Sequence, residues 1–436
     1  MFLFITVLCT SIIANQFEVS RIAVKEELFD ENILTEHPYG IQNTSRNYFP
    51  TDEWRICTPE EQGMNSTLLN EMLPYIESNN WPLDSIIVVR GGYIVYEEYP
   101  NPLFEMDDYH TLQSVTKSFT SALVGIAIRE GFISSVNDTI LDLFSDRNVT
   151  NVDERKERMS IKHLLTMTAG VEWDEWTYPY TDAENNSLAA MVTCHDAIDY
   201  FLNLPMVAEP GDEWVYNSGA CIVLGVLIEE LSNMTLVEFT QEYLFDPIGI
   251  SEAMWVKTGN GVYQAGGGLF MEPRDMARFG FLYLNGGTWN GTQVVQQSWV
   301  LDSTDYQYAL PPYEYYGYYW WHSPAMDVYQ ALGRFGQRIM VSPEEDLVVV
   351  FTASIQGMDY HPHEELYLDY ILESIIGPPR TVTHSTSTTT TTNTSTSTTT
   401  GETNTGLNLL DGIYLSIGAV AIGVVVLFLI RYRRTT

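Results

Sequence analysis

Basic residues are few in this chain of 436 residues: 21 Lys and Arg stand against 57 Asp and Glu, which gives a formal net charge of −36. Such a chain repels phosphate backbones, and outside the C-terminal tail its basic residues form no stripe of the kind that nucleic-acid binders carry. Nucleic acid is therefore not an expected partner. The acidity suits a surface in a salty or extracellular medium, where ions screen the self-repulsion.

Cysteine and histidine are also scarce, with four and eight residues. Cys9 lies in an apolar N-terminal stretch, so the simplest expectation for an exported chain is one disulfide and one free thiol among Cys57, Cys194 and Cys221. His361 and His363 resemble a metal cluster only superficially, because no further ligands converge on them in the sequence. We expect neither a metal nor a cofactor.

Hydrophobic residues make up 45% of the chain and aromatic residues 13%, which supports a large core and excludes global disorder. Residues 1–14 are apolar, too short to span a bilayer comfortably and end in small residues. They predict a cleaved signal peptide, although the usual positive start is missing. A buried N-terminal strand is the alternative, but the segment that follows continues no apolar pattern. Residues 15–50 are a polar lead-in.

The C-terminal region predicts a membrane anchor. Residues 412–430 are uncharged and mostly apolar, and the basic sequence RYRR begins the tail, residues 431–436. Residues 379–411, rich in Ser and Thr, predict a glycosylated stalk. The positive-inside rule then predicts a single-pass protein of the cell membrane with its folded domain, residues 51–378, outside.

Glycosylation sequons agree with export. They begin at Asn43, Asn65, Asn137, Asn148, Asn185, Asn233, Asn290 and Asn393.

Two hairpins frame the folded domain. Residues 85–99 predict the first, with Gly91 and Gly92 suited to its tight turn, and residues 337–354 predict the second, followed by a helix over 364–376. Between them, apolar residues recur at helical spacing over 116–130, 161–168, 194–204, 221–231 and 236–244. The predicted fold class is α/β, with an antiparallel sheet built from both ends of the domain, a large helical insertion and a site where the two meet.

Ser114 is the candidate nucleophile, in the tetrapeptide Ser-Val-Thr-Lys at the start of the helix predicted over 116–130. Residues three apart on a helix share a face, so the amine of Lys117 lies beside the serine hydroxyl. Desolvation in apolar surroundings favours the neutral amine, which can take the serine proton. The alternative, a capping serine and a surface lysine, is weakened by the scarcity of lysine and by the apolar helix around it.

Two further motifs complete the candidate site. Tyr216 opens Tyr-Asn-Ser-Gly, and a tyrosine beside a cationic amine can relay a proton. The glycine-rich residues 333–337 open the second hairpin, where the N–H of Gln337 could form an oxyanion hole with that of Ser114. The alternatives are a tyrosine packed at a turn and a plain bulge.

In this order, the three motifs resemble those of the β-lactamase-like serine hydrolases. This family includes class C β-lactamases, penicillin-binding proteins, D-aminopeptidases, related esterases and 6-aminohexanoate-dimer hydrolases. The likeness covers about Trp54 to Ile376, and supporting segments are SIKHLLTMTAGVEW, GGGLFMEPRDMARFGFLYLNGG and VSPEEDLVVVFTAS. It implies a β-lactamase/transpeptidase-like fold and an acyl-enzyme on Ser114, with Lys117 and Tyr216 as general base and acid.

The sequence departs from the family pattern at two motifs. Ser218 takes a position that often carries Asn, and Arg334, Phe335 and Gly336 stand where Lys or His, Thr or Ser, and Gly are usual. These four residues and Tyr180 are the candidate substrate-binding residues, and the changes argue against a true β-lactamase. The aromatic runs over 177–180 and 313–322 suit an apolar or amide substrate, although core packing accounts for most of them.

The sequence therefore predicts a serine hydrolase that cleaves ester or amide bonds in small molecules or peptides. One alternative is a catalytically silent ectodomain of the same fold that binds a ligand at the cell surface. A purely structural surface protein is another, but it leaves the three motifs unexplained. The substrate itself does not follow from fold analogy.

Overall fold

The computed structural model describes residues 46, 48–310, 314–356 and 362–379. Within these ranges the strands are β1 Leu83–Arg90, β2 Tyr93–Glu98, β3 His110–Thr111, β4 Met254–Trp255, β5 Leu269–Met271, β6 Thr288–Trp289, β7 Thr292–Gln293, β8 Tyr308–Leu310, β9 Glu314–Tyr316, β10 Trp321–Ser323, β11 Val328–Gly333, β12 Gln337–Ser342 and β13 Leu347–Ala353.

The α-helices are α2 Ser66–Asn70, α3 Met72–Asn79, α4 Thr116–Arg129, α5 Ile140–Leu143, α6 Glu154–Glu157, α7 Ile161–Leu165, α8 Ser187–Thr193, α9 Ala197–Leu202, α10 Ser218–Ser232, α11 Leu236–Thr240, α12 Asp246–Ile248, α13 Pro273–Leu284, α14 Gln297–Ser303 and α15 His363–Glu365. Short 3-10 turns are η2 Pro59–Gln62, η3 Gln113–Val115 and η5 Arg334–Gly336, and π-helical turns are η4 Gln241–Phe245 and η6 Leu366–Leu372.

The main sheet joins the two ends of the domain, as predicted. Its strand order is β2-β1-β13-β12-β11-β10-β9-β8, with β1 antiparallel to β13. Gly91 and Gly92 both have positive φ, 60° and 86°, and turn the chain between β1 and β2. Both predicted hairpins are confirmed, and the sequence between them supplies the helical insertion.

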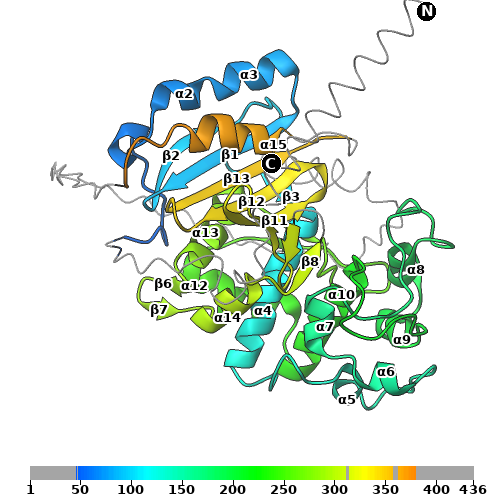
Figure 1. Cartoon of the computed structure of the whole chain (residues 1–436). Coiled ribbons are helices and arrows are strands. Elements are labelled where there is room, and N and C mark those ends of the chain that lie inside the picture. Colours follow the sequence, from blue (N-terminus) through cyan, green and yellow to red (C-terminus); the bar gives the residue numbers. More distant parts are fainter. Residues whose placement is uncertain (1–45, 47, 311–313, 357–361, 380–436) are drawn as a thin grey trace, which may run out of the picture. The chain divides into compact units, whose positions relative to one another are not determined.

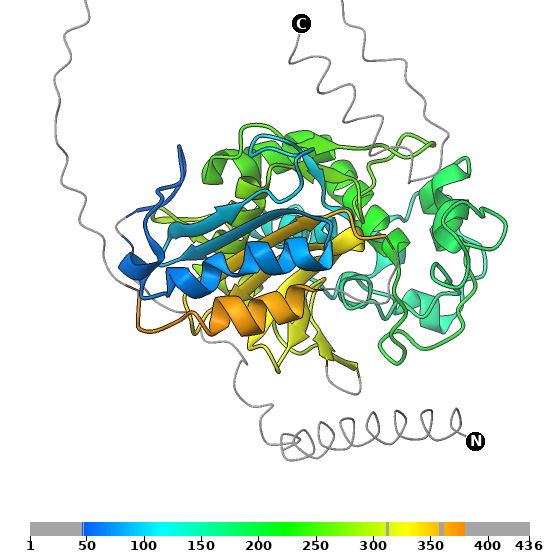
Figure 2. The same ribbon diagram turned by 90° about the horizontal axis from the view of Figure 1, so that it is seen from above.

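Both faces of this sheet are covered. On one face, Val88 and Val349 join a core cluster with residues of α2, α3 and η6, and Figures 1 and 2 show these helices lying over the sheet. On the other face α13 packs so closely that a Cβ on Gly280 would meet side-chain atoms of Ile339 and Val348 at 2.8 and 2.7 Å. Coverage on both sides explains why β1 is buried along its whole length.

The predicted helices are present, with shifted ends. Helix α4 matches its predicted range, whereas α10 starts at Ser218, three residues before the predicted start. The reason is the cap: the side chain of Asn217 accepts a hydrogen bond from the N–H of Ala220, which begins the helix there. The predicted helix over 364–376 is a short α-helix followed by the π-helical η6.

The expectation of one disulfide is wrong, because Cys57, Cys194 and Cys221 are all free. The three cysteines lie in different parts of the fold. The N–H of Cys57 donates to the carbonyl of Ile94 in β2, Cys194 follows the last residue of α8, and Cys221 is buried within α10. Each of the latter two thiols donates to backbone carbonyls of its own neighbourhood.

The predicted signal peptide, stalk, transmembrane helix and tail lie outside the described residues, except residue 379 of the stalk. Among the described residues, no single helix is long and apolar enough to cross a membrane. Helix α10 and the stretch Leu236–Ile248 pass the test together, with a bend of 85° between them.

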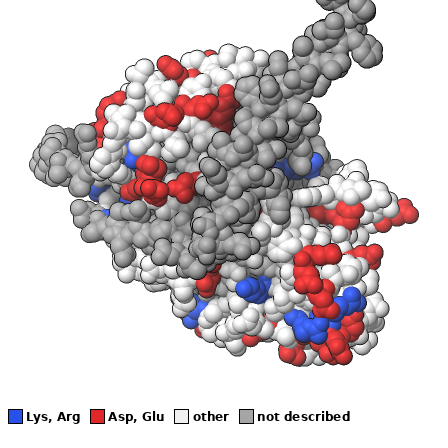
Figure 3. Space-filling view, in the orientation of Figure 1, with Lys and Arg blue, Asp and Glu red and all other residues white. Residues whose placement is uncertain are grey.

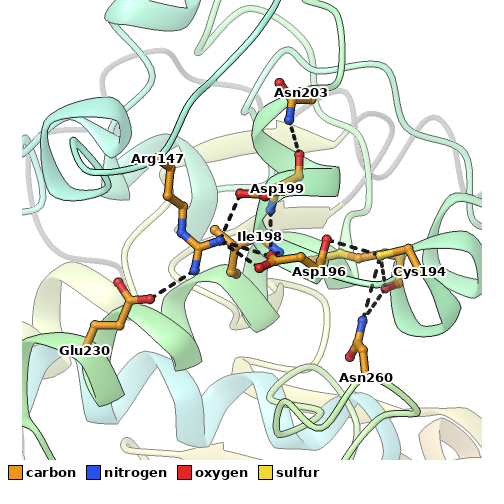
Figure 4. A network of polar contacts seen from close by, with 9 residues as sticks. Arg147, Cys194, Asp196, Ile198, Asp199, Asn203, Glu230 and Asn260 are labelled. Atoms are coloured by element: carbon orange, nitrogen blue, oxygen red, sulfur yellow. Dashed lines mark hydrogen bonds and ion pairs between the residues drawn. The ribbon is translucent and has the colours of Figure 1, made fainter.

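Acidic side chains outnumber basic ones on the described surface that Figure 3 draws. On the face drawn in Figure 3, Asp and Glu cover more of this surface than Lys and Arg do. In the helical insertion, Arg147 binds three carboxylates, those of Asp196, Asp199 and Glu230, at 2.9–3.2 Å (Figure 4). Asp196 also caps α9. One guanidinium thus links the loop after α5 to α9 and α10.

We predict that Arg147→Ala lowers the free energy of unfolding by about 1 kcal/mol, because it leaves three carboxylates facing one another without a cation. Urea denaturation measures this, and the loss should shrink in high salt, which screens the repulsion. Arg158→Ala is the control, since in the described part of the chain Arg158 pairs with one carboxylate, that of Glu209, at a more exposed position. Equal losses for the two variants would contradict a bridging role.

Candidate active site

Ser114 lies in the turn that leads into α4. Gln113 has a left-handed backbone, with φ 48°, and Ser114 follows it in the 3-10 turn η3. A non-glycine residue in this region is strained and is held there by its surroundings. The N–H of Leu112, just before it, donates to the carbonyl of Leu269 at 2.9 Å, which ties the turn to β5.

Lys117 is buried beside this serine, with only 2% of its surface exposed. Its Nζ donates to Ser114 Oγ at 3.1 Å and to the carbonyl of Gly266 at 2.6 Å. It also lies 4.7 Å from the centre of the Tyr216 ring. The structure therefore brings together the three predicted catalytic residues and excludes a surface lysine at this position.

Two opposed effects set the pKa of Lys117. Burial by itself lowers the pKa of Lys117, as desolvation predicts, but the neighbouring side chains of Tyr216, Cys221 and Glu175 outweigh it, and the pKa is raised above its ordinary value. The direction of this shift favours the ammonium form of Lys117 in the resting site. The sequence could not give this balance, because Tyr216, Cys221 and Glu175 are distant along the chain.

Tyr216 lies two residues before α10 and packs against aromatic rings. Trp176 stacks on it, with ring centres 5.0 Å apart, and Trp214 lies 6.1 Å away. Burial raises the pKa of Tyr216, while its contacts with Lys117 and Ser114 lower it without cancelling the effect. The phenol therefore holds its proton at neutral pH.

A glycine-rich loop that sequence reasoning did not assign to the site completes it. The carbonyl of Gly266 accepts from Lys117, and the carbonyl of Ala265 accepts from Thr120 of α4 at 2.7 Å. A Cβ on Gly266 would meet the carbonyl oxygen of Ser218 at 3.0 Å. The run of three glycines that starts here was the available signal, because glycine lets a backbone approach closely.

The third motif packs against the nucleophile turn. A Cβ on Gly333 would meet the carbonyl oxygen of Leu112 at 2.4 Å, so only glycine fits there. Phe335 has φ 68° and Gly336 φ 94°, which turns the chain sharply into β12. Arg334 is exposed, and its guanidinium lies over the rings of Tyr180 and Phe335 at 5.3 and 5.0 Å.

Gln337 begins β12 opposite Gly333. Its side chain is buried and donates to the carbonyl of Ala353 at 2.5 Å, which fixes the start of the strand. Its N–H as part of an oxyanion hole with that of Ser114 stays a prediction.

Ser218 and Tyr180 both contact Glu175, a residue that the sequence analysis missed. Ser218 donates to the Glu175 carboxylate through its N–H at 2.7 Å and its hydroxyl at 2.8 Å, and the Tyr180 hydroxyl donates at 3.3 Å. Glu175 is 2% exposed. The available signal was an acidic residue between two tryptophans in the segment WDEW.

Most of the aromatic run over 313–322 is core, as expected. Tyr316, Tyr318, Tyr319 and Trp320 are buried, whereas Trp321 is half-buried and contacts Trp214 with ring centres 5.8 Å apart.

No group of three or more possible metal ligands occurs among the described residues. Of the two histidines considered from sequence, His361 lies outside these residues. His363 is buried with its ring against Phe351.

A serine, a buried lysine and a tyrosine, held where an antiparallel sheet meets a helical insertion, define a serine hydrolase of the Ser-x-x-Lys type. Comparison with protein families agrees, since the model of the Beta-lactamase family matches residues 74–372. The chain belongs to this family, which includes esterases, amidases and penicillin-binding proteins.

Individual relatives are distant. The chain is similar to the 6-aminohexanoate-dimer hydrolase of Paenarthrobacter ureafaciens, with 26% identity over 323 residues, 68% of this chain and 80% of that protein. Its fold resembles an octameric penicillin-binding protein homologue from Pyrococcus abyssi, with TM-score 0.57, 20% identity and coverage of 72% and 77% of the two chains. It also resembles a family VIII carboxylesterase, with TM-score 0.58, 14% identity and coverage of 73% and 98%.

We predict that kcat/KM for a p-nitrophenyl ester rises as pH increases above neutral. Because the pKa values of Lys117 and Tyr216 are both raised, the form of the pair that can accept a proton becomes populated only as pH increases through them. Tyr216→Phe should lower kcat/KM by about 10²-fold or more. Tyr178→Phe, at a more exposed tyrosine of the same region, is the control. A profile that is flat from pH 6 to 9 would refute the assignment.

Proposed function

We propose that this chain hydrolyses ester or amide bonds in small molecules or peptides through an acyl-enzyme on Ser114. The observation that carries the proposal is the hydrogen bond of 3.1 Å between Lys117 Nζ and Ser114 Oγ, made by a lysine that is buried and also held by Gly266. A buried ammonium beside a serine hydroxyl is costly to maintain for packing alone. This supports catalysis over a silent binding module of the same fold.

In the proposed reaction, Lys117 and Tyr216 act as one proton-handling pair, as general base and acid. The Ser114 oxygen attacks the substrate carbonyl while the pair takes its proton, and the N–H groups of Ser114 and Gln337 bind the oxyanion. The pair then gives a proton to the departing alcohol or amine, which leaves an ester on Ser114. Water, deprotonated by the same pair, cleaves that ester and restores the hydroxyl.

The third motif favours substrates other than β-lactams. Phe335 brings no hydroxyl to the position where the family usually has Thr or Ser, and its left-handed backbone fixes the turn around it. Arg334 contacts the Tyr180 ring, so Arg334, Phe335, Gly336, Tyr180 and Ser218 are proposed to shape the substrate site.

The aromatic residues beside Tyr216 favour an apolar leaving group. Trp176 is 60% exposed although it stacks on Tyr216, and Trp214 and Trp321 extend the same group of rings. Exposed aromatic surface that continues from a catalytic residue is typical of a ligand site. Since Tyr216 is proposed to protonate the leaving group, these rings would contact that part of the substrate.

We also propose that the protein is anchored in the cell membrane with the domain outside, through the predicted signal peptide and the helix over 412–430. The sequons are in keeping with this. Among those in the described residues, five asparagines are exposed on the surface: Asn137, Asn148, Asn185, Asn233 and Asn290.

The first test is covalent labelling of the purified protein with a fluorophosphonate and, separately, with a penicillin probe. We expect the fluorophosphonate to modify Ser114, located by mass spectrometry, and the penicillin to leave it unmodified, with Ser114→Ala as the control. Labelling by penicillin would instead favour the peptidase or β-lactamase branch. No labelling by either reagent, together with no cleavage of p-nitrophenyl esters, would support the silent binding module.

A second test addresses the leaving group. Trp176→Ala should raise KM about fivefold for phenyl esters, the loss of about 1 kcal/mol of aromatic contact, and change KM for methyl esters little. Leu103→Ala, at an exposed apolar residue on a different loop, is the control. The same change for both ester types would argue against a leaving-group site at Trp176.

A further inference from the structure

Glu175 is a buried residue near the catalytic residues. Its carboxylate accepts four hydrogen bonds. Its Oε2 accepts from the N–H of Ser218 at 2.7 Å and from the indole N–H of Trp173 at 2.8 Å. Its Oε1 accepts from the hydroxyls of Ser218 at 2.8 Å and Tyr180 at 3.3 Å. Buried carboxylates are rare without such partners.

These four bonds decide what Glu175 can do. Each carboxylate oxygen has two lone pairs, so the four donors occupy all of them. No lone pair remains for a proton from Ser114 or for a cationic group of a substrate. The Glu175 carboxylate is thus fully engaged by donors of the protein, which suits a positioning role rather than that of a general base or a substrate ligand.

The bonds also fix the position of Tyr216. Ser218 is the first residue of α10, a helix of 15 residues, so the carboxylate lies at a helix N-terminus, where a negative charge is favoured. Tyr216 is two residues earlier in the chain. Trp176, the residue after Glu175, stacks on the Tyr216 ring. Glu175 is thus connected to Tyr216 in two ways: it binds Ser218, two residues after Tyr216, and it precedes Trp176, whose ring stacks on Tyr216.

We propose that Glu175 is a positioning residue for the reaction: it anchors the start of α10, which holds the Tyr216 phenol against Lys117, and it places a fixed negative charge beside this pair. The proposal rests on the proposed function, because it assigns a role only if Lys117 and Tyr216 handle protons.

The charge of Glu175 predicts a pH dependence that a purely structural role would not produce. Tyr216, Cys221 and Glu175 are the ionisable groups that act on Lys117. The charges of Lys117 and Glu175 affect the pKa of Tyr216. Tyr216 in turn interacts electrostatically with Tyr180 and Tyr316, and Arg334 affects the pKa of Tyr180. Glu175 raises the pKa of both Lys117 and Tyr216. Its removal should therefore lower both values and let the pair accept a proton at lower pH.

The test compares the full chain with Glu175→Gln, which keeps the size and removes the charge. We measure the rate of fluorophosphonate labelling of Ser114, and kcat and KM for a p-nitrophenyl ester, between pH 5 and 10. We expect kcat to fall about tenfold, KM to stay within about twofold, and the acid limb of kcat/KM to move about one unit toward lower pH.

Two matched variants keep the charge and remove one donor each: Ser218→Ala and Trp173→Phe. They should lower kcat by about threefold without moving the acid limb. If Glu175→Gln does not fold, Glu175→Asp takes its place. Asp keeps the charge on a shorter side chain, so it should lower kcat and leave the limb unmoved.

The outcomes separate this inference from the proposed function. If fluorophosphonate labels Ser114 equally fast in the wild type and Glu175→Gln, or if kcat falls with an unmoved acid limb in Glu175→Gln, the positioning proposal is overturned. A limb that moves in Glu175→Asp also overturns it. If Ser114 is not labelled in the wild type, the proposed function itself fails.

Discussion

The ammonium group of Lys117 is the constraint on which the site depends. An unpaired buried ammonium costs several kcal/mol, so the fold is stable only if partners for it are in place. One partner, the Ser114 hydroxyl, is three residues away, but the Gly266 carbonyl and the ring of Tyr216 come from distant parts of the chain. The site therefore forms only when the nucleophile turn, the glycine-rich loop and the start of α10 have met.

This requirement explains the close packing around the nucleophile. Thr116 and Thr120, both on α4, bond the loop on either side of Gly266, through the N–H of Leu269 and the carbonyl of Ala265. The loop is thus held in register along the helix that carries Lys117. The end of β11 also packs against the nucleophile turn. Gly333 approaches the carbonyl of Leu112 so closely that no side chain would fit there.

The sequence predicted what depends on local spacing. Ser114 and Lys117 are three residues apart on a helix, and the paired hairpins showed as apolar runs around turn residues, so these parts of the fold and site could be predicted. Glu175 could not, because its partner Ser218 is 43 residues away in the chain. The direction of the Lys117 pKa shift could not be predicted for the same reason: burial is visible in an apolar helix, whereas the neighbouring groups that outweigh its effect are brought close only by the fold.

The balance of charge inside the site bears on how an oxyanion is stabilised. Lys117 brings one positive charge and Glu175 one negative charge, in a chain whose net charge is −36. A buried carboxylate near a developing oxyanion would oppose it, unless hydrogen bonds disperse its charge. The four donors on Glu175 do this, and they include the N-terminus of α10. Lys117 Nζ, by contrast, lies 3.1 Å from Ser114 Oγ, where the reaction begins.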